Sequence, residues 1–319
     1  MTRAPRKRTA TEERNPRSRE LDRLPTQELV RVIHHEDATV LAAVRKELPA
    51  IARAIDAIVD ALSRGGRLIY VGAGTSGRLA TLDAAECPPT FGTSPKLVQA
   101  VIAGGRRALT DAVEGAEDDA KQAARDLKAR QITKADVVVG LTASGTTPYV
   151  LGALQLARRR GAMTIGITSN RDSPIQWLAR ITIAPETGPE VVAGSTRMKA
   201  GTAQKLVLNM LSTAAMIRLG HVYSNWMVDV ALTNEKLRRR GLRILQEASG
   251  AAESEAARAL AGAGNRLRVA LVMLKMKSSA GEARQRLLQA GGNLRRALGE
   301  SSQQRASRLK LNGSERQED

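Results

Sequence analysis

The stretch that decides the fold of this chain is Val71-Gly-Ala-Gly-Thr-Ser-Gly-Arg-Leu79. It follows residues 67–71, a short apolar run that predicts a β-strand, and it leads into residues 77–86, which have helical spacing. A second turn of this kind, Thr142-Ala-Ser-Gly-Thr-Thr-Pro148, follows residues 137–141, an apolar run typical of a strand covered on both faces. Two glycine- and hydroxyl-rich turns between strand and helix predict an α/β protein that binds its ligand at the carboxyl ends of parallel strands.

The rest of the main body continues the same alternation of strands and helices. Residues 38–62 have helical spacing that is interrupted at Pro49. Further strands are expected at residues 97–103, 163–167 and 181–184, and further helices at residues 107–129, 147–160 and 200–219. This alternation predicts a doubly wound parallel sheet.

Composition changes along the chain and predicts four parts. Residues 1–20 are expected to form a flexible basic arm, and residues 21–240 the α/β domain with its N-terminal helices. Residues 241–300 contain short stretches rich in Ala, Leu and Arg that predict a small appendage of two or three helices. Residues 301–319 are expected to be a polar tail.

The formal net charge of +18 does not by itself indicate a nucleic-acid-binding protein. Much of the excess lies at the two ends, because residues 1–20 carry seven basic and three acidic side chains and residues 231–319 carry 18 basic and nine acidic ones. Aromatic residues make up only 2% of the chain, whereas nucleic-acid modules commonly use aromatic stacking. We therefore do not expect specific nucleic-acid binding.

The sequence is typical of a cytoplasmic protein. Its single cysteine, Cys87, allows no intrachain disulfide and fits a reducing compartment. The first 19 residues are basic and polar, unlike a secretory signal, and no apolar run approaches the roughly 20 residues of a membrane span. No membrane association is expected.

The first turn has the glycine spacing of a dinucleotide-binding fingerprint, which is a weak signal alone. The second strand ends in Gly104-Gly-Arg-Arg107 and lacks the acidic residue that would bind a ribose, so NADP remains an alternative. Two hydroxyl-rich turns at helix N-termini suit a small phosphorylated ligand better, because each supplies free N–H groups and a positive dipole. Tight turns with helix caps are the other interpretation. The candidate ligands of the phosphate are Gly74, Thr75, Ser76, Ser144, Gly145, Thr146 and Thr147.

A third segment, residues 188–205, clusters charges and hydroxyls just before a buried helix. Ser195, Arg197 and Lys199 are candidates for binding anionic ligand groups. An ion-paired start of the helix is the alternative interpretation.

Two glutamates are candidates for acid–base chemistry. Glu86 is followed by Cys87 and two prolines that restrict the backbone, and Glu117 lies in an acidic cluster that could also be a solvated helix start. A Cys87–histidine nucleophile is not expected, since the chain has only three histidines. The run His34-His-Glu-Asp37 contains metal-ligand types, but adjacent helical positions point apart, so a polar surface is expected there.

Taken together, these segments resemble the N-acetylmuramic acid 6-phosphate etherase family, whose members have the sugar isomerase (SIS) fold. The resemblance extends over about residues 11–300 in order. It is carried by Val71–Leu79, Asp83-Ala-Ala-Glu-Cys-Pro-Pro-Thr90, Ala112-Val-Glu-Gly-Ala-Glu-Asp118, Ala143-Ser-Gly-Thr-Thr-Pro-Tyr149, Gly194-Ser-Thr-Arg-Met-Lys-Ala-Gly-Thr-Ala-Gln-Lys205, Thr11-Glu-Glu-Arg-Asn15 and Asn225-Trp-Met-Val-Asp-Val230.

The resemblance implies a homodimeric, flavodoxin-like SIS enzyme of cell-wall amino sugar recycling. It would cleave the D-lactyl ether of N-acetylmuramic acid 6-phosphate to N-acetylglucosamine 6-phosphate and D-lactate, by elimination followed by addition of water. Glu86 matches the acid that protonates the leaving lactate oxygen, and Glu117 matches the base at C2, although which is acid and which is base stays open. No metal or organic cofactor is implied.

The family comparison also implies that Ser76, Ser144, Thr146 and Thr147 hold the 6-phosphate. Thr146 stands where the family commonly has Arg, so the phosphate contacts of this chain are expected to differ in detail. Three alternatives remain: a non-catalytic phosphosugar-binding regulator akin to glucokinase regulatory protein, an SIS aldose–ketose isomerase, and a dinucleotide-dependent oxidoreductase.

Overall fold

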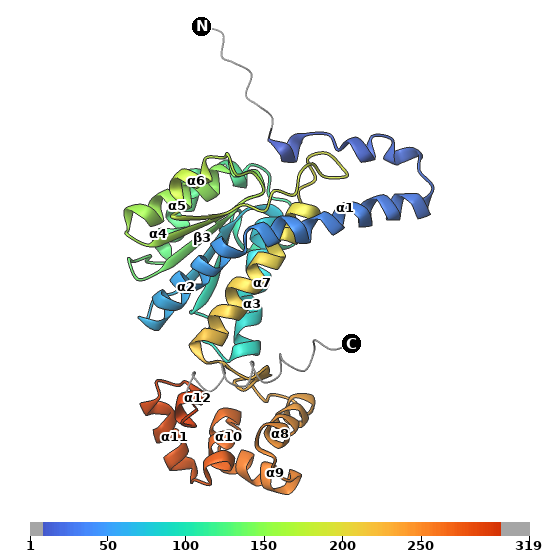
Figure 1. Cartoon of the computed structure of the whole chain (residues 1–319). Coiled ribbons are helices and arrows are strands. Elements are labelled where there is room, and N and C mark those ends of the chain that lie inside the picture. Colours follow the sequence, from blue (N-terminus) through green and yellow to red (C-terminus); the bar gives the residue numbers. More distant parts are fainter. Residues whose placement is uncertain (1–8, 301–319) are drawn as a thin grey trace. The chain divides into compact units, whose positions relative to one another are not determined.

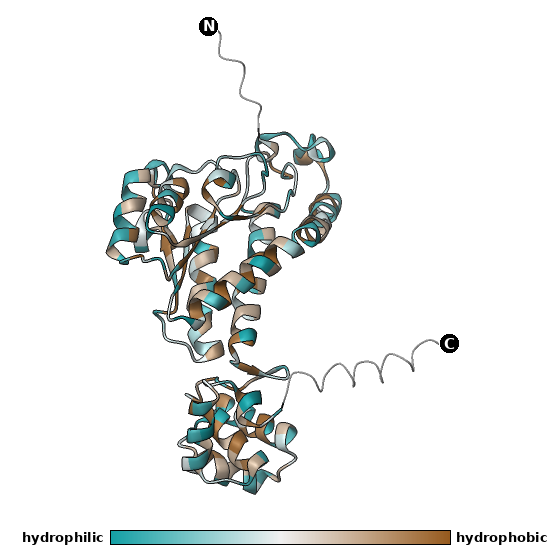
Figure 2. Ribbon diagram, turned by 60° about the vertical axis from the view of Figure 1, so that its left-hand side comes forward, coloured by the Kyte–Doolittle hydropathy of each residue, from teal (hydrophilic) through white to brown (hydrophobic). Residues whose placement is uncertain are grey.

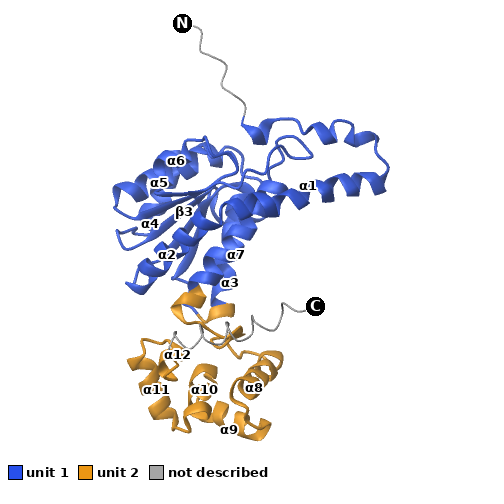
Figure 3. Ribbon diagram, viewed as in Figure 1, with its two compact units in different colours: residues 1–88, 93–215 blue, residues 89–92, 216–319 orange. Residues whose placement is uncertain are grey.

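The computed structural model describes residues 9–300 and divides them into two compact units (Figure 3). Unit 1 runs to Ala215 but omits Pro89–Gly92, which belong with Met216 and the following residues in unit 2. The expected boundary near residue 241 is thus placed too late, since the long helix that ends at Leu219 passes from one unit into the other.

Unit 1 is built on a five-stranded parallel sheet (Figure 1). Its strands are β1 (Leu68–Gly72), β2 (Val98–Ile102), β3 (Val137–Leu141), β4 (Met163–Ile167) and β5 (Ile181–Ile183). The order β2-β1-β3-β4-β5 is that of a flavodoxin-like doubly wound sheet, which confirms the predicted fold class. The predicted bounds of β3 and β4 are confirmed, and those of the other strands differ by one or two residues.

The sheet is covered on both faces, which explains why its strands are apolar throughout. Helices α4 (Ala120–Ala129), α5 (Pro148–Arg159) and α6 (Ile175–Leu178) lie on one side in Figure 1, and α2 (Leu48–Ser63), α3 (Gly74–Phe91) and α7 (Lys199–Leu219) on the other. Side chains of a strand alternate between faces. Ile69 and Val71 of β1 accordingly pack with α5, whereas the hydroxyl of Tyr70 donates to Asp83 of α3 at 3.0 Å.

The break predicted at Pro49 separates α1 (Thr26–Lys46) from α2, because a proline disrupts the interior of a helix but is tolerated in its first turn. The single helix predicted for residues 107–129 is wrong in its first half. Two 3-10 turns, η4 (Gly105–Leu109) and η5 (Ala116–Asp118), precede α4. Gly115 adopts a left-handed φ of 69° before η5, and the Asp119 carboxylate then accepts a hydrogen bond from Gln122 N to start α4.

Residues 9–20 do not form the flexible arm that was predicted. They contain two 3-10 turns, η1 (Ala10–Glu12) and η2 (Pro16–Ser18), and a third turn, η3 (Leu21–Arg23), follows them. Thr11 and Asn15 are only 1% and 5% exposed, so this segment packs on the rest of unit 1. The predictions for residues 1–8 and for the polar tail 301–319 lie outside the described residues.

Unit 2 has a hairpin and a helical core of its own. The hairpin pairs β6 (Val222–Tyr223) with β7 (Trp226–Met227). Five helices follow where two or three were expected, namely α8 (Glu235–Ser249), α9 (Glu253–Gly262), α10 (Leu267–Met276), α11 (Ala280–Gln289) and α12 (Leu294–Ala297). Residues 269–272 of α10 are buried in the apolar core of this unit, and Figure 2 shows the polar sides of the helices turned outward. Within residues 9–300, no helix combines the length and the apolar character needed to cross a membrane.

Candidate active site

The two hydroxyl-rich turns lie side by side at the carboxyl edge of the sheet, because β1 and β3 are paired with Gly72 opposite Leu141. A Cβ on Gly72 would lie 2.7 Å from the backbone N of Gly77, so the chain can turn this tightly only with glycine there. Gly74 and Thr75 open α3 at the surface, and Ser76 in the same first turn is buried. Helix N-termini with free N–H groups are ready binding sites for anions.

The turn after β3 holds a cluster of four hydroxyl groups. Thr142 Oγ1 lies 2.7 Å from Thr147 Oγ1 and 3.2 Å from Ser144 Oγ, and the Thr146 hydroxyl donates to Ser144 Oγ at 2.9 Å. Gly145 in their midst has a φ of +75°, and a Cβ there would lie 2.0 Å from Ser173 Oγ. The turn therefore requires glycine, and it presents Ser144, Thr146 and Thr147 at the N-terminus of α5.

The third predicted segment also reaches this edge. A Cβ on Gly201, in the first turn of α7, would lie 3.4 Å from Thr75 Cγ2, so the start of α7 is packed against the start of α3. Ser195 is half-buried and Arg197 is exposed just before α7. The arrangement brings the N-termini of α3 and α5 and several hydroxyls together, which is suited to a phosphate group.

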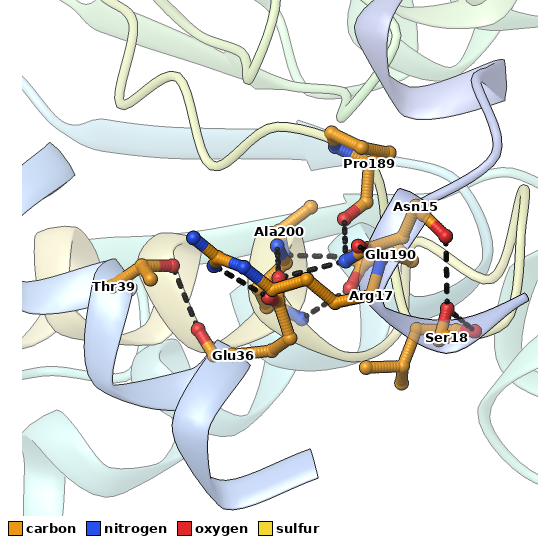
Figure 4. Close-up of polar contacts among 10 residues, drawn as sticks. Asn15, Arg17, Ser18, Glu36, Thr39, Pro189, Glu190 and Ala200 are labelled. Carbon is orange, nitrogen blue, oxygen red and sulfur yellow. Dashed lines mark hydrogen bonds and ion pairs between the residues drawn. The ribbon is translucent and has the colours of Figure 1, made fainter. Parts of the chain in front are cut away.

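Lys199 is engaged in an ion pair rather than facing this edge. Its Nζ lies 2.6 Å from Glu36 Oε2, and the two side chains are 3% and 4% exposed. The backbone N–H groups of Lys199 and Ala200 donate to the Glu190 carboxylate at 2.9 and 3.0 Å (Figure 4). The alternative interpretation of this segment, an ion-paired start of the helix, thus applies to Lys199. The prediction that Lys199 binds substrate has no geometric support, because its charged group is already buried against Glu36.

Glu36 is the centre of a buried polar cluster that the sequence analysis did not foresee. Its carboxylate accepts hydrogen bonds from Asn15, Arg17 and Lys199. Burial raises the pKa of Glu36, but these three donors outweigh burial and lower the pKa to about 2. The prediction of a polar surface at residues 34–37 is therefore wrong for Glu36, although His34 and His35 are exposed. An acidic residue in an otherwise ordinary amphipathic helix carries no local signal of a partner 163 positions away.

Glu117 lies on η5, which packs on α5. The neighbouring Ala116 is packed in the core cluster that contains Tyr149 in the first turn of α5. Glu117 itself is exposed. The connection before it is tied to α3, since Arg78 donates from Nε to Leu109 O at 3.2 Å and from Nη2 to Asp111 O at 2.8 Å. The fold thus packs the turn that carries Glu117 against α5.

Glu86 is not brought to this place within one chain. It is exposed and stands 12 residues after Gly74 in α3, so a rise of 1.5 Å per residue separates the two by about 18 Å along the helix axis. Its neighbour Cys87 is 2% exposed, and burial raises the pKa of the thiol to about 12. Cys87 is therefore a neutral core residue at neutral pH, in agreement with the expectation that it is not a nucleophile.

A cavity of about 630 Å³ lies elsewhere in unit 1, beside the edge strand β2 and helix α4. It is lined by residues such as Ile102, Arg106, Gln122 and Arg130 and includes none of the predicted site residues. The geometry of the strand ends, rather than the size of a cavity, therefore identifies the candidate site.

Comparison with known proteins agrees with this geometry. The chain matches the model of the glucokinase regulatory protein N-terminal SIS domain over residues 50–158 and that of the SIS domain over residues 117–214. It is 53% identical to N-acetylmuramic acid 6-phosphate etherase of Geobacillus thermodenitrificans over 91% of this chain and 98% of that protein. It is 55% identical to the Yersinia pestis (strain Pestoides F) protein of the same name over 90% of this chain and 98% of that protein.

Among solved structures, a phosphoheptose isomerase from Francisella tularensis is similar, with a TM-score of 0.49 and 19% identity. The match covers 61% of this chain and all of that one.

Proposed function

Because the chain belongs to the N-acetylmuramic acid 6-phosphate etherase family, we propose that its strand-end turns and two glutamates carry out the reaction for which that family is named. The enzyme cleaves the D-lactyl ether of N-acetylmuramic acid 6-phosphate in cell-wall sugar recycling, releasing D-lactate and N-acetylglucosamine 6-phosphate. The observation that carries this conclusion is an identity of 53% to 55% over 90% or more of the chain and 98% of the relatives. A regulator is not favoured, since these relatives are etherases over nearly their whole length.

We place the 6-phosphate at the carboxyl edge of the sheet, between the starts of α3 and α5. The first-turn N–H groups of both helices and the hydroxyls of Ser76, Ser144, Thr146 and Thr147 would hold its oxygens. Gly74, Thr75 and Gly145 shape the turns, and Ser195 and Arg197 border the place from the segment before α7. The four hydroxyls after β3 and β1 can each rotate to donate to an anion.

The chemistry proceeds by elimination and then addition. In the open-chain aldehyde form the proton on C2 is acidic, and a carboxylate removes it while the C3–O bond to lactate breaks. A carboxylic acid gives a proton to the departing lactate oxygen, and water later adds to C3 of the unsaturated aldehyde. We assign C2 deprotonation to Glu117 because it matches the family's base and its turn packs on α5, the helix whose first residues would hold the phosphate. Glu86 is assigned to the leaving oxygen and the water.

Glu86 can serve this site if it comes from a second copy of the chain. The distance of about 18 Å along α3 is longer than a hexose phosphate, so the Glu86 of the same chain is out of reach. Leu82 precedes Glu86 by one helical turn and is 45% exposed, as expected of an apolar residue that a partner covers. We therefore propose a cytoplasmic homodimer in which each site combines Glu117 of one chain with Glu86 of the other.

A test of the reaction measures D-lactate release from N-acetylmuramic acid 6-phosphate in ¹⁸O-labelled water. Etherase chemistry predicts lactate with unlabelled ether oxygen, a sugar product labelled at C3, and loss of turnover in Glu86→Gln and Glu117→Gln. Release of labelled lactate would contradict cleavage at C3, and no release by the wild type would contradict the proposed function.

Mixed dimers test the shared site directly. A dimer of one Glu86→Gln chain and one Glu117→Gln chain contains one intact site if Glu86 acts across the interface, because both substitutions then fall in the other site. If both glutamates act within one chain, every site carries a substitution and the mixture stays inactive. Mixing each variant with itself is the control.

A further inference from the structure

Residues 9–18, here called the N-terminal clip, contact two loops of the proposed site that are far from them in sequence. One is the hydroxyl turn after β3, at residues 142–147, and the other is the loop of residues 188–196 that leads into α7. The clip is buried at Thr11 and Asn15, which are 1% and 5% exposed. Its contacts are side-chain hydrogen bonds rather than strand pairing, so single substitutions can remove them.

The first contact runs from Thr11 to the hydroxyl turn through Asn170. Asn170 Nδ2 donates to Thr11 Oγ1 at 3.2 Å and to the carbonyl oxygen of Ala143 at 2.9 Å. Ala143 directly precedes Ser144, and its carbonyl also accepts from the Thr168 hydroxyl at 3.2 Å. The two N–H groups of one buried amide thus join the clip to the turn, and Thr11 fixes the orientation of that amide.

The second contact runs from Asn15 and Ser18 to the loop before α7 (Figure 4). Asn15 Nδ2 donates to Pro189 O at 3.2 Å and to Glu36 Oε2 at 2.8 Å, and the Ser18 hydroxyl donates to Val191 O at 2.7 Å. The loop contains neither helix nor strand before Lys199, and the carbonyls of Pro189 and Val191 are bonded by these side chains from outside it. Glu36 joins this contact to Lys199 at the start of α7.

We propose that the N-terminal clip positions both loops for the phosphate of the substrate, with Thr11 and Asn15 as its positioning residues. Neither side chain is placed to touch the reacting carbons, so their effect is expected on binding of the phosphosugar. If the hydroxyl turn were free to rearrange, ordering it would cost free energy when the ligand binds. A turn that the clip already holds in place does not incur this cost. The inference rests on the proposed function, because it assumes that a sugar phosphate occupies this edge.

The test compares Thr11→Val and Asn15→Ala with two controls. Thr11→Ser keeps the acceptor oxygen, and Arg23→Ala removes an exposed ion pair with Glu20 in the next 3-10 turn. For each protein we would measure KM and kcat for D-lactate release, the Kd of N-acetylglucosamine 6-phosphate by calorimetry, and Tm. We expect KM and Kd to rise roughly tenfold in both clip variants, with kcat changed much less, because a buried hydrogen bond is lost in each. Thr11→Ser and Arg23→Ala should match the wild type.

The inference is overturned if KM and Kd of both clip variants equal those of the wild type. It is also overturned if kcat falls as much as KM rises while Thr11→Ser fails to restore either, since the clip would then serve folding alone. Wild-type protein that binds no N-acetylglucosamine 6-phosphate would instead refute the proposed function. The two variants act on different loops, so a failure of one of them to fold leaves the other as the test.

Discussion

At the scale of single residues, Glu36 and Lys199 form a buried ion pair in unit 1. Both charges are buried, and the carboxylate is also held by Asn15 and Arg17. Removing one member of a buried pair leaves an uncompensated charge, which is more costly than the pair itself is stabilising.

Glu36→Gln should therefore destabilise the protein by about 3 kcal/mol at neutral pH. The pKa of Glu36 is lowered from 4.5 to about 2, so its contribution is complete above pH 4.5 and is lost as the pH falls towards 2. Urea denaturation of wild type and Glu36→Gln at several pH values measures this difference. A difference in unfolding free energy that does not shrink below pH 4.5 would contradict the assignment, and Glu20→Gln, at an exposed pair, is the control.

Thr146 is the residue at which we expect the proposed phosphate turn to depart from the pattern common in the family. It is exposed at the N-terminus of α5, beside Ser144 and Thr147. Thr146→Arg adds a cation near the proposed phosphate and should lower KM roughly three- to tenfold at low salt, with a smaller gain at high salt because exposed charges are screened. Steady-state kinetics at two ionic strengths measure it. An unchanged KM at low salt would place the phosphate away from residue 146.

At the scale of elements, the turn between β3 and α5 requires glycine at position 145. Gly145 combines a positive φ with a close approach to Ser173 of the neighbouring segment. The same turn leads from a fully buried strand into a helix whose first residues bear the hydroxyls. Its shape is thus set by packing from outside the turn as well as by its own residues.

Gly145→Ala should lower stability by about 2–4 kcal/mol and weaken product binding, because the new Cβ would overlap Ser173 Oγ in addition to the strain at φ. Gly105→Ala is the matched control, since Gly105 has a φ of +65° and nothing lies within 4 Å of the added Cβ. Thermal unfolding and calorimetric binding measure both. Equal losses of stability in the two variants would show that φ alone, and not the contact with Ser173, explains the requirement for glycine at position 145.

At the scale of the whole molecule, one chain holds the phosphate turns and Glu117 but carries its own Glu86 far along α3. The exposed Leu82 lies on the same helix as Glu86. The proposed dimer would bring Glu86 of one chain to the turns of the other.

Leu82→Glu should weaken the dimer, reduce D-lactate release by at least about tenfold, and leave binding of N-acetylglucosamine 6-phosphate within a few-fold of wild type. Binding should persist because the turns after β1 and β3 belong to one chain. Sedimentation velocity and calorimetry on the same samples measure the outcome. A monomer with full turnover would contradict the shared site. Leu288→Glu, an apolar residue of unit 2 that is 81% exposed, is the control for surface charge.

The sequence by itself determined the features that arise from near neighbours in the chain. The apolar runs of β3 and β4, the two glycine- and hydroxyl-rich turns and the α/β class follow from local patterns. Glu86 and Glu117 were acid–base candidates from their local context, and their roles came from family resemblance. Only the tertiary structure decided that Thr11 reaches Asn170 across 159 positions, that Lys199 is paired with Glu36, and that residues 9–20 pack instead of forming an arm. Such contacts depend on the path of the whole chain, because burial selects a distant partner that no local spacing encodes.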